Sequence, residues 1–316
     1  MKAMLPPSGV NDVSTRKKWL TGCSGIITGL VIILAVVLWR AWAALLGPEG
    51  QYFDSAGVLI HYTDEGQGVP VVLVHGFSNP AHLQWRRTGR IEALKKEYRV
   101  IALDARGHGR SGKPHDPDAY GVQMVEDVVR LLDHLHIDKA HVVGYSMGGF
   151  ITLKLAVLHP ERLLSAAVCG AGWLQPTEEN REFGETVARS IETRTGFGPL
   201  LRRLGLPDRP MTFWEKAALH LVFTFYHDPK ALAAVSRASS QLSLTEAELR
   251  ANTVPVLTII GGEDGLLPEA EALASVMTNH RLVVLEGKNH NNTDVSTEFL
   301  ADLQQFLAAH TPAKPR

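Results

Sequence analysis

Short apolar runs bounded by turn residues recur along the chain from about residue 52 onward. Tyr52–Asp54 and Val58–Tyr62 flank Gly57 and have the pattern of two antiparallel strands. Strands that are apolar on both faces are typical of a parallel sheet that helices cover on both sides. Six later runs have this character: Val69–Val74, Arg99–Leu103, His141–Val143, Leu163–Val168, Val256–Ile260 and Leu282–Leu285.

Helical periods alternate with these predicted strands. Apolar residues recur at helical spacing from Val125 to Leu135, and again from Phe150 to Val157. A repeated strand-then-helix order is typical of α/β proteins, in which right-handed crossovers place helices on both faces of one sheet. We therefore predict an α/β domain with a mostly parallel, doubly wound sheet.

The stretch from 172 to 252 interrupts this alternation. It has several helical patches and no convincing strand, and a Ser243–Glu246 capping box opens its last helix. About eighty residues is far more than an ordinary connection needs. The pattern predicts a helical insertion at 172–252, with the core formed by 51–171 and 253–316. Aromatic residues gather in the insertion: Phe213, Trp214, Phe223, Phe225 and Tyr226.

The first fifty residues have a different pattern. Trp19–Trp39 is a run of 21 residues without a charge. About twenty apolar residues cross a hydrocarbon core of roughly 30 Å as a helix, and tryptophan at both ends suits the headgroup level. The run predicts one transmembrane helix at 19–39, preceded by a cytoplasmic tail at 1–18 and followed by a linker at 40–50.

Charges around this run predict its orientation. Four basic residues precede it, whereas Arg40 stands alone just after it. The positive-inside bias then keeps the N-terminus in the cytoplasm and places the large domain outside it. The expected location is a single-pass membrane protein. Residues 41–43, Ala-Trp-Ala, also match a signal-peptide cleavage pattern, so removal of the segment stays open as an alternative.

Composition limits the classes of partner and cofactor. The 316 residues have a formal net charge of −1, which gives no broad basic surface for nucleic acid. The two cysteines, Cys23 and Cys169, cannot form a disulfide framework or a zinc site on their own. The fourteen histidines are scattered, without a metal-ligand cluster. We expect no nucleic-acid partner, no metal and no other cofactor.

Residues 144–148 read Gly-Tyr-Ser-Met-Gly, directly after a predicted strand and directly before a predicted helix. Glycine at both ends lets the backbone make a tight strand-to-helix turn. Such a turn exposes the serine hydroxyl at a helix N-terminus, where negative charge is stabilised. The motif in this position predicts that Ser146 is a nucleophile.

A serine hydroxyl needs a neighbouring base, and the base needs an orienting acid. For this type of turn the expected chain order is serine, acid, histidine. Asp264 follows the strand predicted at 256–260, and His290 follows the strand predicted at 282–285, so both should reach the same edge of the sheet. Asp264 as a helix cap and His290 as a surface residue are the structural alternatives. The ordered set of three favours a catalytic triad.

With these residues the chain resembles the α/β-hydrolase superfamily, over about residues 52–309. Residues 75–77, His-Gly-Phe, match the family's HG motif after a strand, and residues 104–112 look like its D-x-R-G-x-G-x-S loop. Asp264 stands four residues before Pro268, as the family acid commonly does. One position departs from the family pattern, because Asn289 precedes His290 where many members have glycine.

The resemblance implies further roles. The backbone N–H groups of Phe77 and Met147 would form an oxyanion hole, and 172–252 would be a lid over the acyl site. The implied activity is a carboxylic-ester hydrolase, an esterase or lipase without cofactor, acting on a lipophilic, acylglycerol-like ester. Its layout is similar to that of membrane-anchored monoacylglycerol lipases. His75, Asp104 and Arg106 would hold the surrounding loops.

Other functions of the same fold stay open, because fold alone does not decide function. They are hydrolysis of C–C bonds beside a carbonyl, a cofactor-free haloperoxidase, and a hydrolase-like binding protein or receptor. Dehalogenases and epoxide hydrolases of this fold use an aspartate nucleophile, where this turn has Ser146. Residues 107–112 also fit a dinucleotide-binding glycine pattern, but Pro114 and Pro117 keep that stretch in a loop, which excludes the interpretation.

Overall fold

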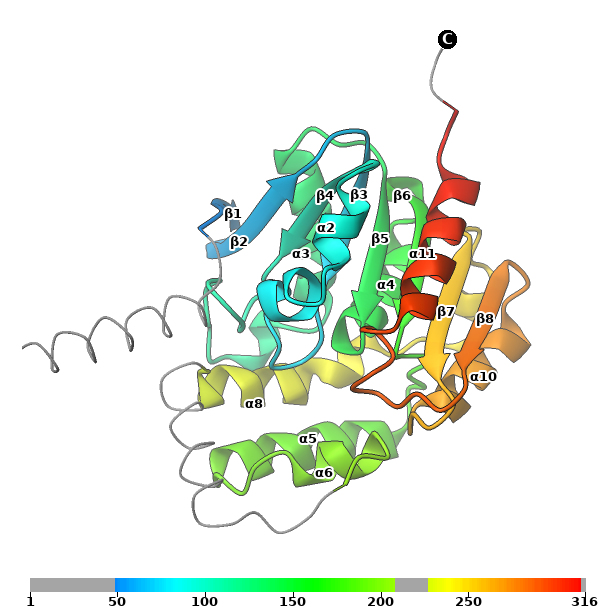
Figure 1. Ribbon diagram of the computed structural model, residues 1–316. Coiled ribbons are helices and arrows are strands. Elements are labelled where there is room, and N and C mark those ends of the chain that lie inside the picture. The colour runs from blue at the N-terminus through cyan, green and yellow to red at the C-terminus, as the bar shows by residue number, and fades with distance from the viewer. Residues whose placement is uncertain (1–48, 208–226, 314–316) are drawn as a thin grey trace, which may run out of the picture. The chain divides into compact units, whose positions relative to one another are not determined.

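One eight-stranded sheet forms the centre of the computed structural model, which describes residues 49–207 and 227–313 (Figure 1). The strand order is β1-β2-β4-β3-β5-β6-β7-β8. Strand β2 pairs antiparallel with β1 and β4, and every other neighbouring pair is parallel. The strands are β1 (Gln51–Ser55), β2 (Val58–Glu65), β3 (Val69–Val74), β4 (Tyr98–Leu103), β5 (Ala140–Tyr145), β6 (Leu163–Cys169), β7 (Val256–Gly261) and β8 (His280–Leu285).

The predicted strands and the mostly parallel sheet are confirmed, with observed strands that are somewhat longer than the apolar runs. Strands β3 to β7 are buried almost throughout. Burial on both faces requires apolar side chains on both faces, which explains why their sequences do not alternate. The sequence pattern therefore identifies the central strands well and their polar ends less well.

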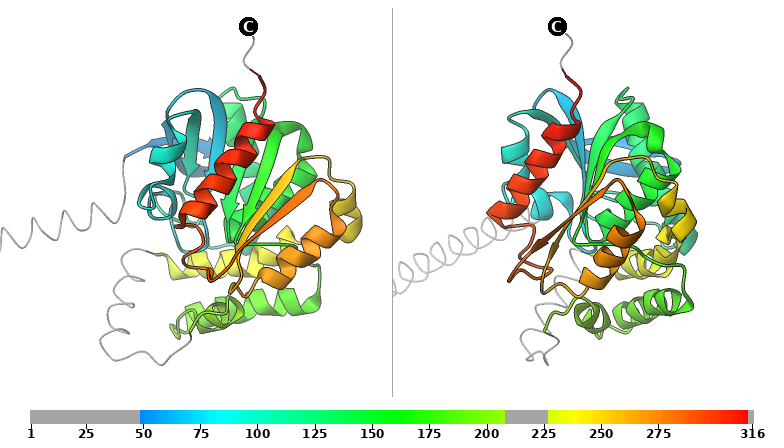
Figure 2. Two further views of the ribbon diagram at one scale, coloured as in Figure 1. Left: turned by 45° about the vertical axis from the view of Figure 1, so that its right-hand side comes forward. Right: turned by 90° about the vertical axis from the view of Figure 1, so that its right-hand side faces the viewer.

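Helices cover both faces of the sheet (Figure 2). On one face, α3 (Val122–His134), α4 (Met147–Leu158) and α10 (Leu267–Val276) bury their apolar residues in one core. On the other face, α2 (Arg90–Leu94) and α11 (Thr297–His310) bury theirs in a second core. Burying one large aliphatic or aromatic side chain contributes roughly 1.5–3 kcal/mol to the free energy of unfolding. The two cores confirm the doubly wound arrangement.

Between β6 and β7 the chain forms only helices in the part that the structure describes. Helices α5 (Glu178–Glu192), α6 (Gly198–Arg203) and α8 (Pro229–Ala238) lie beyond the carboxyl ends of the parallel strands (Figure 1). Helices α5 and α8 share a small apolar cluster of Val187, Ile191 and Leu232. The aromatic residues predicted to enrich this insertion fall in 208–226, outside the described residues. Shorter helical turns occur at η1 (His82–Arg86, a π-helix), η2 (Pro117–Ala119), η3 (Pro160–Arg162) and η4 (Ser239–Leu242).

The predicted capping box is displaced along the chain. Helix α9 (Glu246–Arg250) begins after Thr245, whose side chain accepts the Glu248 N–H, while the Glu248 carboxylate accepts the Thr245 N–H. The expected pair was Ser243 and Glu246. Ser243 and Thr245 each stand three residues before a glutamate, so both pairs fit the capping-box pattern. The helix begins at the second pair, Thr245 and Glu248.

The expectation of a single-pass membrane protein with an extracytoplasmic domain has to be corrected. Within residues 49–207 and 227–313, no helix is long and apolar enough to cross a membrane. The longest helix of these ranges is α5 with 15 residues, which corresponds to about 22 Å against roughly 30 Å of hydrocarbon. Trp19–Trp39, on which the expectation depended, lies outside the described residues. The membrane span and membrane attachment are therefore withdrawn.

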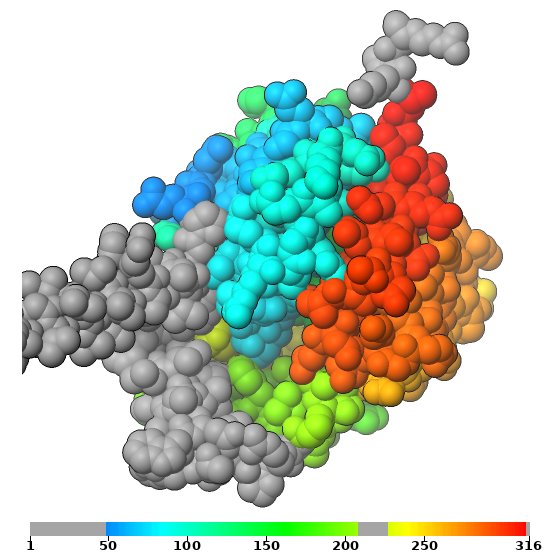
Figure 3. All heavy atoms as spheres, in the orientation of Figure 1, coloured from blue at the N-terminus to red at the C-terminus, as the bar shows by residue number. Residues whose placement is uncertain are grey.

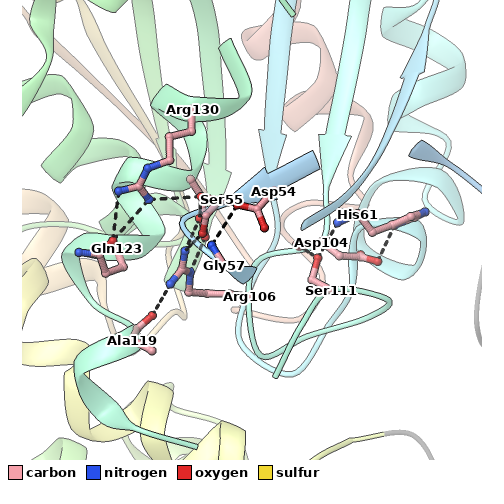
Figure 4. A network of polar contacts seen from close by, with 11 residues as sticks. Asp54, Ser55, Gly57, His61, Asp104, Arg106, Ser111, Ala119, Gln123 and Arg130 are labelled. Carbon is pink, nitrogen blue, oxygen red and sulfur yellow. Dashed lines mark hydrogen bonds and ion pairs between the residues drawn. The ribbon is translucent and has the colours of Figure 1, made fainter. Parts of the chain in front are cut away.

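A buried network around Arg106 joins the β1–β2 turn to α3 (Figure 4). The Arg106 guanidinium donates to both carboxylate oxygens of Asp127, at 2.7 and 2.5 Å, and to the Ala119 carbonyl at 2.7 Å. The Ser55 hydroxyl donates to the same carboxylate at 2.5 Å. Arg106 and Asp127 are both almost fully buried. Removing one partner would leave the other charge buried without compensation.

Asp104 forms a second buried centre in the same region. Its carboxylate accepts the Ala81 N–H at 2.9 Å, the Arg110 N–H at 3.0 Å and the His61 Nδ1–H at 2.9 Å. Burial alone would raise the pKa of Asp104, but the hydrogen bond from His61 and the neighbouring His75 outweigh it and hold the pKa at about 2. Asp104 thereby fixes the loop after β3 to the loop after β4, which is the structural role expected for it.

We predict that Asp127→Ala lowers the free energy of unfolding by about 3–5 kcal/mol, because Arg106 would be left as an unpaired buried cation. Urea denaturation followed by circular dichroism measures this loss. The matched control is Asp302→Ala, which removes the part-exposed ion pair to Arg281 and should cost no more than about 1 kcal/mol. Equal losses in the two variants would contradict the prediction.

Candidate active site

Ser146 lies in the turn between β5 and α4, with φ 54° and ψ −116°. A non-glycine residue in this region of backbone space costs on the order of 1–3 kcal/mol, which the surrounding structure must offset. Part of that support is the hydrogen bond from the Ser146 N–H to the Cys169 carbonyl, at 2.8 Å. The turn places the serine side chain at the N-terminus of α4, as the motif predicts.

Two glycines allow this turn to form. A Cβ atom on Gly144 would lie 1.9 Å from the Gly148 carbonyl oxygen, and a Cβ atom on Gly148 would lie 2.1 Å from the Val74 carbonyl oxygen. Both distances are far below any van der Waals contact. The glycines are therefore required by the close approach of the turn to itself and to the end of β3.

Ser146, His290 and Asp264 form one line of hydrogen bonds. The Ser146 hydroxyl lies 3.0 Å from His290 Nε2, and His290 Nδ1 lies 2.8 Å from Asp264 Oδ2. A carboxylate can only accept, so Nδ1 carries the proton and Nε2 is the acceptor for the serine hydroxyl. His290 and Asp264 are both more than nine-tenths buried. The three residues predicted as a triad thus come together at the carboxyl ends of β5, β7 and β8.

Asp264 does not form the side-chain cap of α10, which was its structural alternative. The N-cap of α10 is Leu266, and no side chain caps it. Asp264 Oδ1 instead accepts the Leu266 N–H at 3.0 Å, while its other oxygen faces His290. The neighbouring carboxylate, Glu263, is exposed. Asp264 is therefore the acid that the geometry pairs with His290.

The departure at Asn289 has a local explanation. A glycine at this position would permit a left-handed backbone, but Asn289 is not among the described non-glycine residues with positive φ. Its side-chain oxygen accepts the Asn291 N–H at 2.9 Å, and its own N–H donates to Asn292 Oδ1 at 2.7 Å. Asparagine side chains thus close the turn that holds His290.

Tyr145 was missed by the sequence reasoning. Its hydroxyl donates to the His290 carbonyl at 2.6 Å, and its ring centroid lies 5.4 Å from that of His290. Burial raises the pKa of the Tyr145 phenol, so the group stays protonated and remains a donor. Because Tyr145 immediately precedes Ser146, this bond ties the backbone of the histidine to the serine turn.

His75 supports the loop that contains Phe77. Its Nδ1 donates to the Gly76 carbonyl at 2.8 Å, and its Nε2 accepts the Ala105 N–H at 2.9 Å. Burial lowers the pKa of His75, which keeps the imidazole neutral and able to make both bonds. Phe77 and Met147, the residues expected to supply the oxyanion hole, line the same cavity as Ser146. Their donor role is a prediction.

Two cavities meet at Ser146. The first has a volume of about 130 Å³ and a mostly apolar lining that includes Phe150, Phe183, Val187, Val235 and Leu242. The second has a volume of about 400 Å³ and includes His290 with several polar side chains. Among the residues that the structure describes, no group of three or more His, Cys, Asp or Glu side chains could hold a metal ion.

Comparison with known proteins agrees with this fold. A family model described as the alpha/beta hydrolase fold matches residues 69–194. A dihydrolipoyllysine-residue acetyltransferase component of an acetoin cleaving system from Pseudomonas putida is 32% identical over 72% of this chain, and the match spans 60% of that protein. A 2-hydroxymuconate semialdehyde hydrolase from a Pseudomonas strain is 32% identical, with 70% of this chain and 80% of the relative covered.

Among solved structures, the chain is similar to that of a carboxylesterase from the thaumarchaeon Nitrososphaera gargenis. The TM-score is 0.67 at 25% identity, and the match covers 83% of this chain and 99% of the other. Proteins similar to this chain thus include esterases, hydrolases of meta-cleavage products and enol-lactonases. Two relatives are 32% identical to this chain over 72% and 70% of its length, and the family model and the serine turn agree with them. We conclude that this protein belongs to the α/β-hydrolase superfamily.

Proposed function

We propose that the protein hydrolyses carboxylic esters, with Ser146 as nucleophile, His290 as general base and Asp264 as the acid that orients it. The observation that carries this proposal is the unbroken line of hydrogen bonds from the serine hydroxyl to the buried carboxylate, at 3.0 and 2.8 Å. The carboxylesterase similarity supports the same reaction class. A serine turn with a base and an oriented acid is the arrangement that activates a hydroxyl for acyl transfer.

In the proposed reaction, Ser146 Oγ attacks the ester carbonyl carbon as its proton moves to His290 Nε2. The N–H groups of Phe77 and Met147 stabilise the negative charge that develops on the carbonyl oxygen. The C–O bond to the alcohol then breaks, and His290 returns the proton to the departing oxygen. A water molecule attacks the acyl-serine with His290 again as base, which releases the carboxylic acid and restores the hydroxyl.

The apolar cavity is the proposed acyl site. Its volume of about 130 Å³ is slightly below that of an engineered cavity of roughly 150 Å³ that binds benzene. A chain of about four to six carbons is therefore the expected acyl group. Helices α5 and α8 supply part of the lining through Phe183, Val187 and Val235, which supports the proposal that 172–252 acts as a lid.

A hydrolase of C–C bonds is the second candidate. The 32% identical Pseudomonas relative, a 2-hydroxymuconate semialdehyde hydrolase, supports it. Both reactions can begin with the same serine, histidine and aspartate, so the triad does not separate them. Parallel assays with simple esters and with a meta-cleavage product decide between the two.

The triad proposal predicts unequal effects of two neighbouring carboxylates. Ser146→Ala should abolish labelling by a fluorophosphonate probe and lower kcat on p-nitrophenyl butyrate by about five to six orders of magnitude. Asp264→Asn should lower kcat by several orders of magnitude, because the His290 tautomer would no longer be fixed. Glu263→Gln is the matched control and should leave kcat within about twofold, since Glu263 is exposed.

Circular dichroism and thermal unfolding establish that each variant is folded. Wild-type turnover by Ser146→Ala would refute the proposed nucleophile. A large loss in Glu263→Gln together with an active Asp264→Asn would show that the acid is misassigned.

The acyl-site proposal predicts a chain-length optimum. On p-nitrophenyl esters of increasing length, kcat/KM should be greatest near butyrate to hexanoate. Phe183→Ala widens the apolar cavity and should shift the optimum to longer chains, by about fourfold in kcat/KM for each further methylene that becomes buried. Phe197→Ala is the control, because Phe197 lines the larger cavity and does not line the apolar one. The same shift in both variants would show a general loosening of the insertion instead.

A further inference from the structure

We infer that the larger cavity beside Ser146 receives the alcohol part of the ester and selects alcohols that carry further hydroxyl groups. This inference rests on the proposed ester hydrolysis and adds a substrate class to it. The cavity has a volume of about 400 Å³ and contains both Ser146 and His290. Apolar side chains and Tyr145 form part of its lining, and its further polar residues are Ser78, Asn79, Gln84, Thr88, Asn291 and Asp294.

Three of these side chains form a continuous polar line. Asn79 Nδ2 donates to Gln84 Oε1 at 2.8 Å, and Gln84 Nε2 donates to Asp294 Oδ2. Gln84 and Asp294 are each only 5% exposed. Amide and carboxylate side chains are rarely buried to this extent, so their position in the wall of this cavity is informative. Because both ends of the Gln84 amide are engaged, its orientation is fixed. A carboxylate can accept about four hydrogen bonds. The hydrogen bond from Gln84 uses one of these positions on Asp294.

This line lies close to the reacting serine. A Cβ atom built on Gly76 would be 3.4 Å from Gln84 Oε1 and also 3.4 Å from Ser146 Cβ, so these two groups are neighbours. Asp294 follows His290 by four residues in the loop between β8 and α11, and η1, which contains Gln84, precedes α2. Figure 3 shows the cyan segment around α2 against the red segment around the start of α11, although they are far apart in the chain.

The charges around Asp294 favour a neutral partner. Burial raises the pKa of the Asp294 carboxyl, while the Gln84 hydrogen bond and the Arg90 charge oppose that increase. An anionic leaving group would be repelled by the ionised carboxyl, and the nearby Arg90 offsets the attraction for a cation. A hydroxyl group can donate to the carboxylate, or accept from the protonated acid. Neutral hydroxyl groups therefore suit Asp294 in both of its protonation states.

The placement has a consequence for the reaction. His290 must return a proton to the alcohol oxygen as it leaves, and Asp294 lies in the same cavity as that imidazole. Hydrogen bonds from the additional hydroxyl groups to Asp294 and Asn79 would hold the alcohol oxygen beside His290 Nε2. A plain alkyl alcohol would instead offer no hydrogen bond to the acceptor positions of Asp294 that Gln84 does not occupy, which a site built on hydrogen bonds disfavours.

The test compares 1-glyceryl monobutyrate with propyl butyrate, which share the acyl group and a three-carbon alcohol and differ in two hydroxyl groups. We expect the wild-type enzyme to prefer the glyceryl ester in kcat/KM by about tenfold or more. Asp294→Asn and Asn79→Ala should each lower the ratio of kcat/KM for the glyceryl ester to kcat/KM for propyl butyrate by about fivefold or more. Asp302→Asn, on α11 outside both cavities, should retain the full preference.

Several results would overturn the inference. They are a wild-type enzyme without preference for the glyceryl ester, an equal loss on both esters in both cavity variants, and faster turnover of butyrylcholine, which carries charge without a hydroxyl donor. Asn79→Ala keeps the test decisive if Asp294→Asn does not fold, because Asn79 is only partly buried. Ser146-dependent hydrolysis of propyl butyrate without any glyceryl preference refutes the inference alone. No hydrolysis of any ester refutes the proposed function as well.

Discussion

The close approach of the backbone to itself around Ser146 is the constraint on which the proposed active site depends. At Gly144 and Gly148 there is no room for a Cβ atom, because carbonyl oxygens lie within about 2 Å of where it would be. This packing holds Ser146 at a positive φ, and the adjacent Tyr145 hydroxyl then reaches the His290 carbonyl. A larger residue at either glycine would therefore displace Ser146 and also release the loop that contains His290.

Much of this arrangement could be predicted from the sequence, because it depends on local patterns. Central strands bury both faces and are apolar throughout, and Ser146 and Asp264 each follow such a strand, whereas His290 follows the edge strand β8. The polar line from Asn79 to Asp294 could not be predicted, because Gln84 and Asp294 are 210 positions apart and meet only after the sheet has formed. The displaced capping box shows another limit, since neighbouring residues satisfied one spacing rule equally well. The membrane span was predicted from the length of an uncharged run and from tryptophan at both of its ends, and no described helix has the required length and apolar character.

The two cavities have different origins in the fold. The apolar one is lined largely by helices of the insertion between β6 and β7, together with α4. The larger one takes its polar side chains from loops that follow β3 and β8 and from η1, and its apolar side chains largely from the insertion: Phe197, Leu200, Leu201, Leu204 and Leu206. Leu200 and Leu204 line both cavities, whereas Phe183, Val187 and Val235 line only the apolar one. Substitutions at these last three positions therefore change the lining of one cavity and leave that of the other unchanged.

The Ser146 N–H donates to the carbonyl of Cys169, the last residue of β6, whose side chain is part of the buried core on one face of the sheet. Cys169 is a fully buried free cysteine, and burial raises the pKa of its thiol. Since the thiolate is the reactive form, reagents can modify it only when the centre of the sheet opens. In a Cys23→Ser background, the rate of thiol modification under native conditions would report the free energy of that opening. The chain thus contains a natural probe of how firmly the turn around Ser146 is held in place.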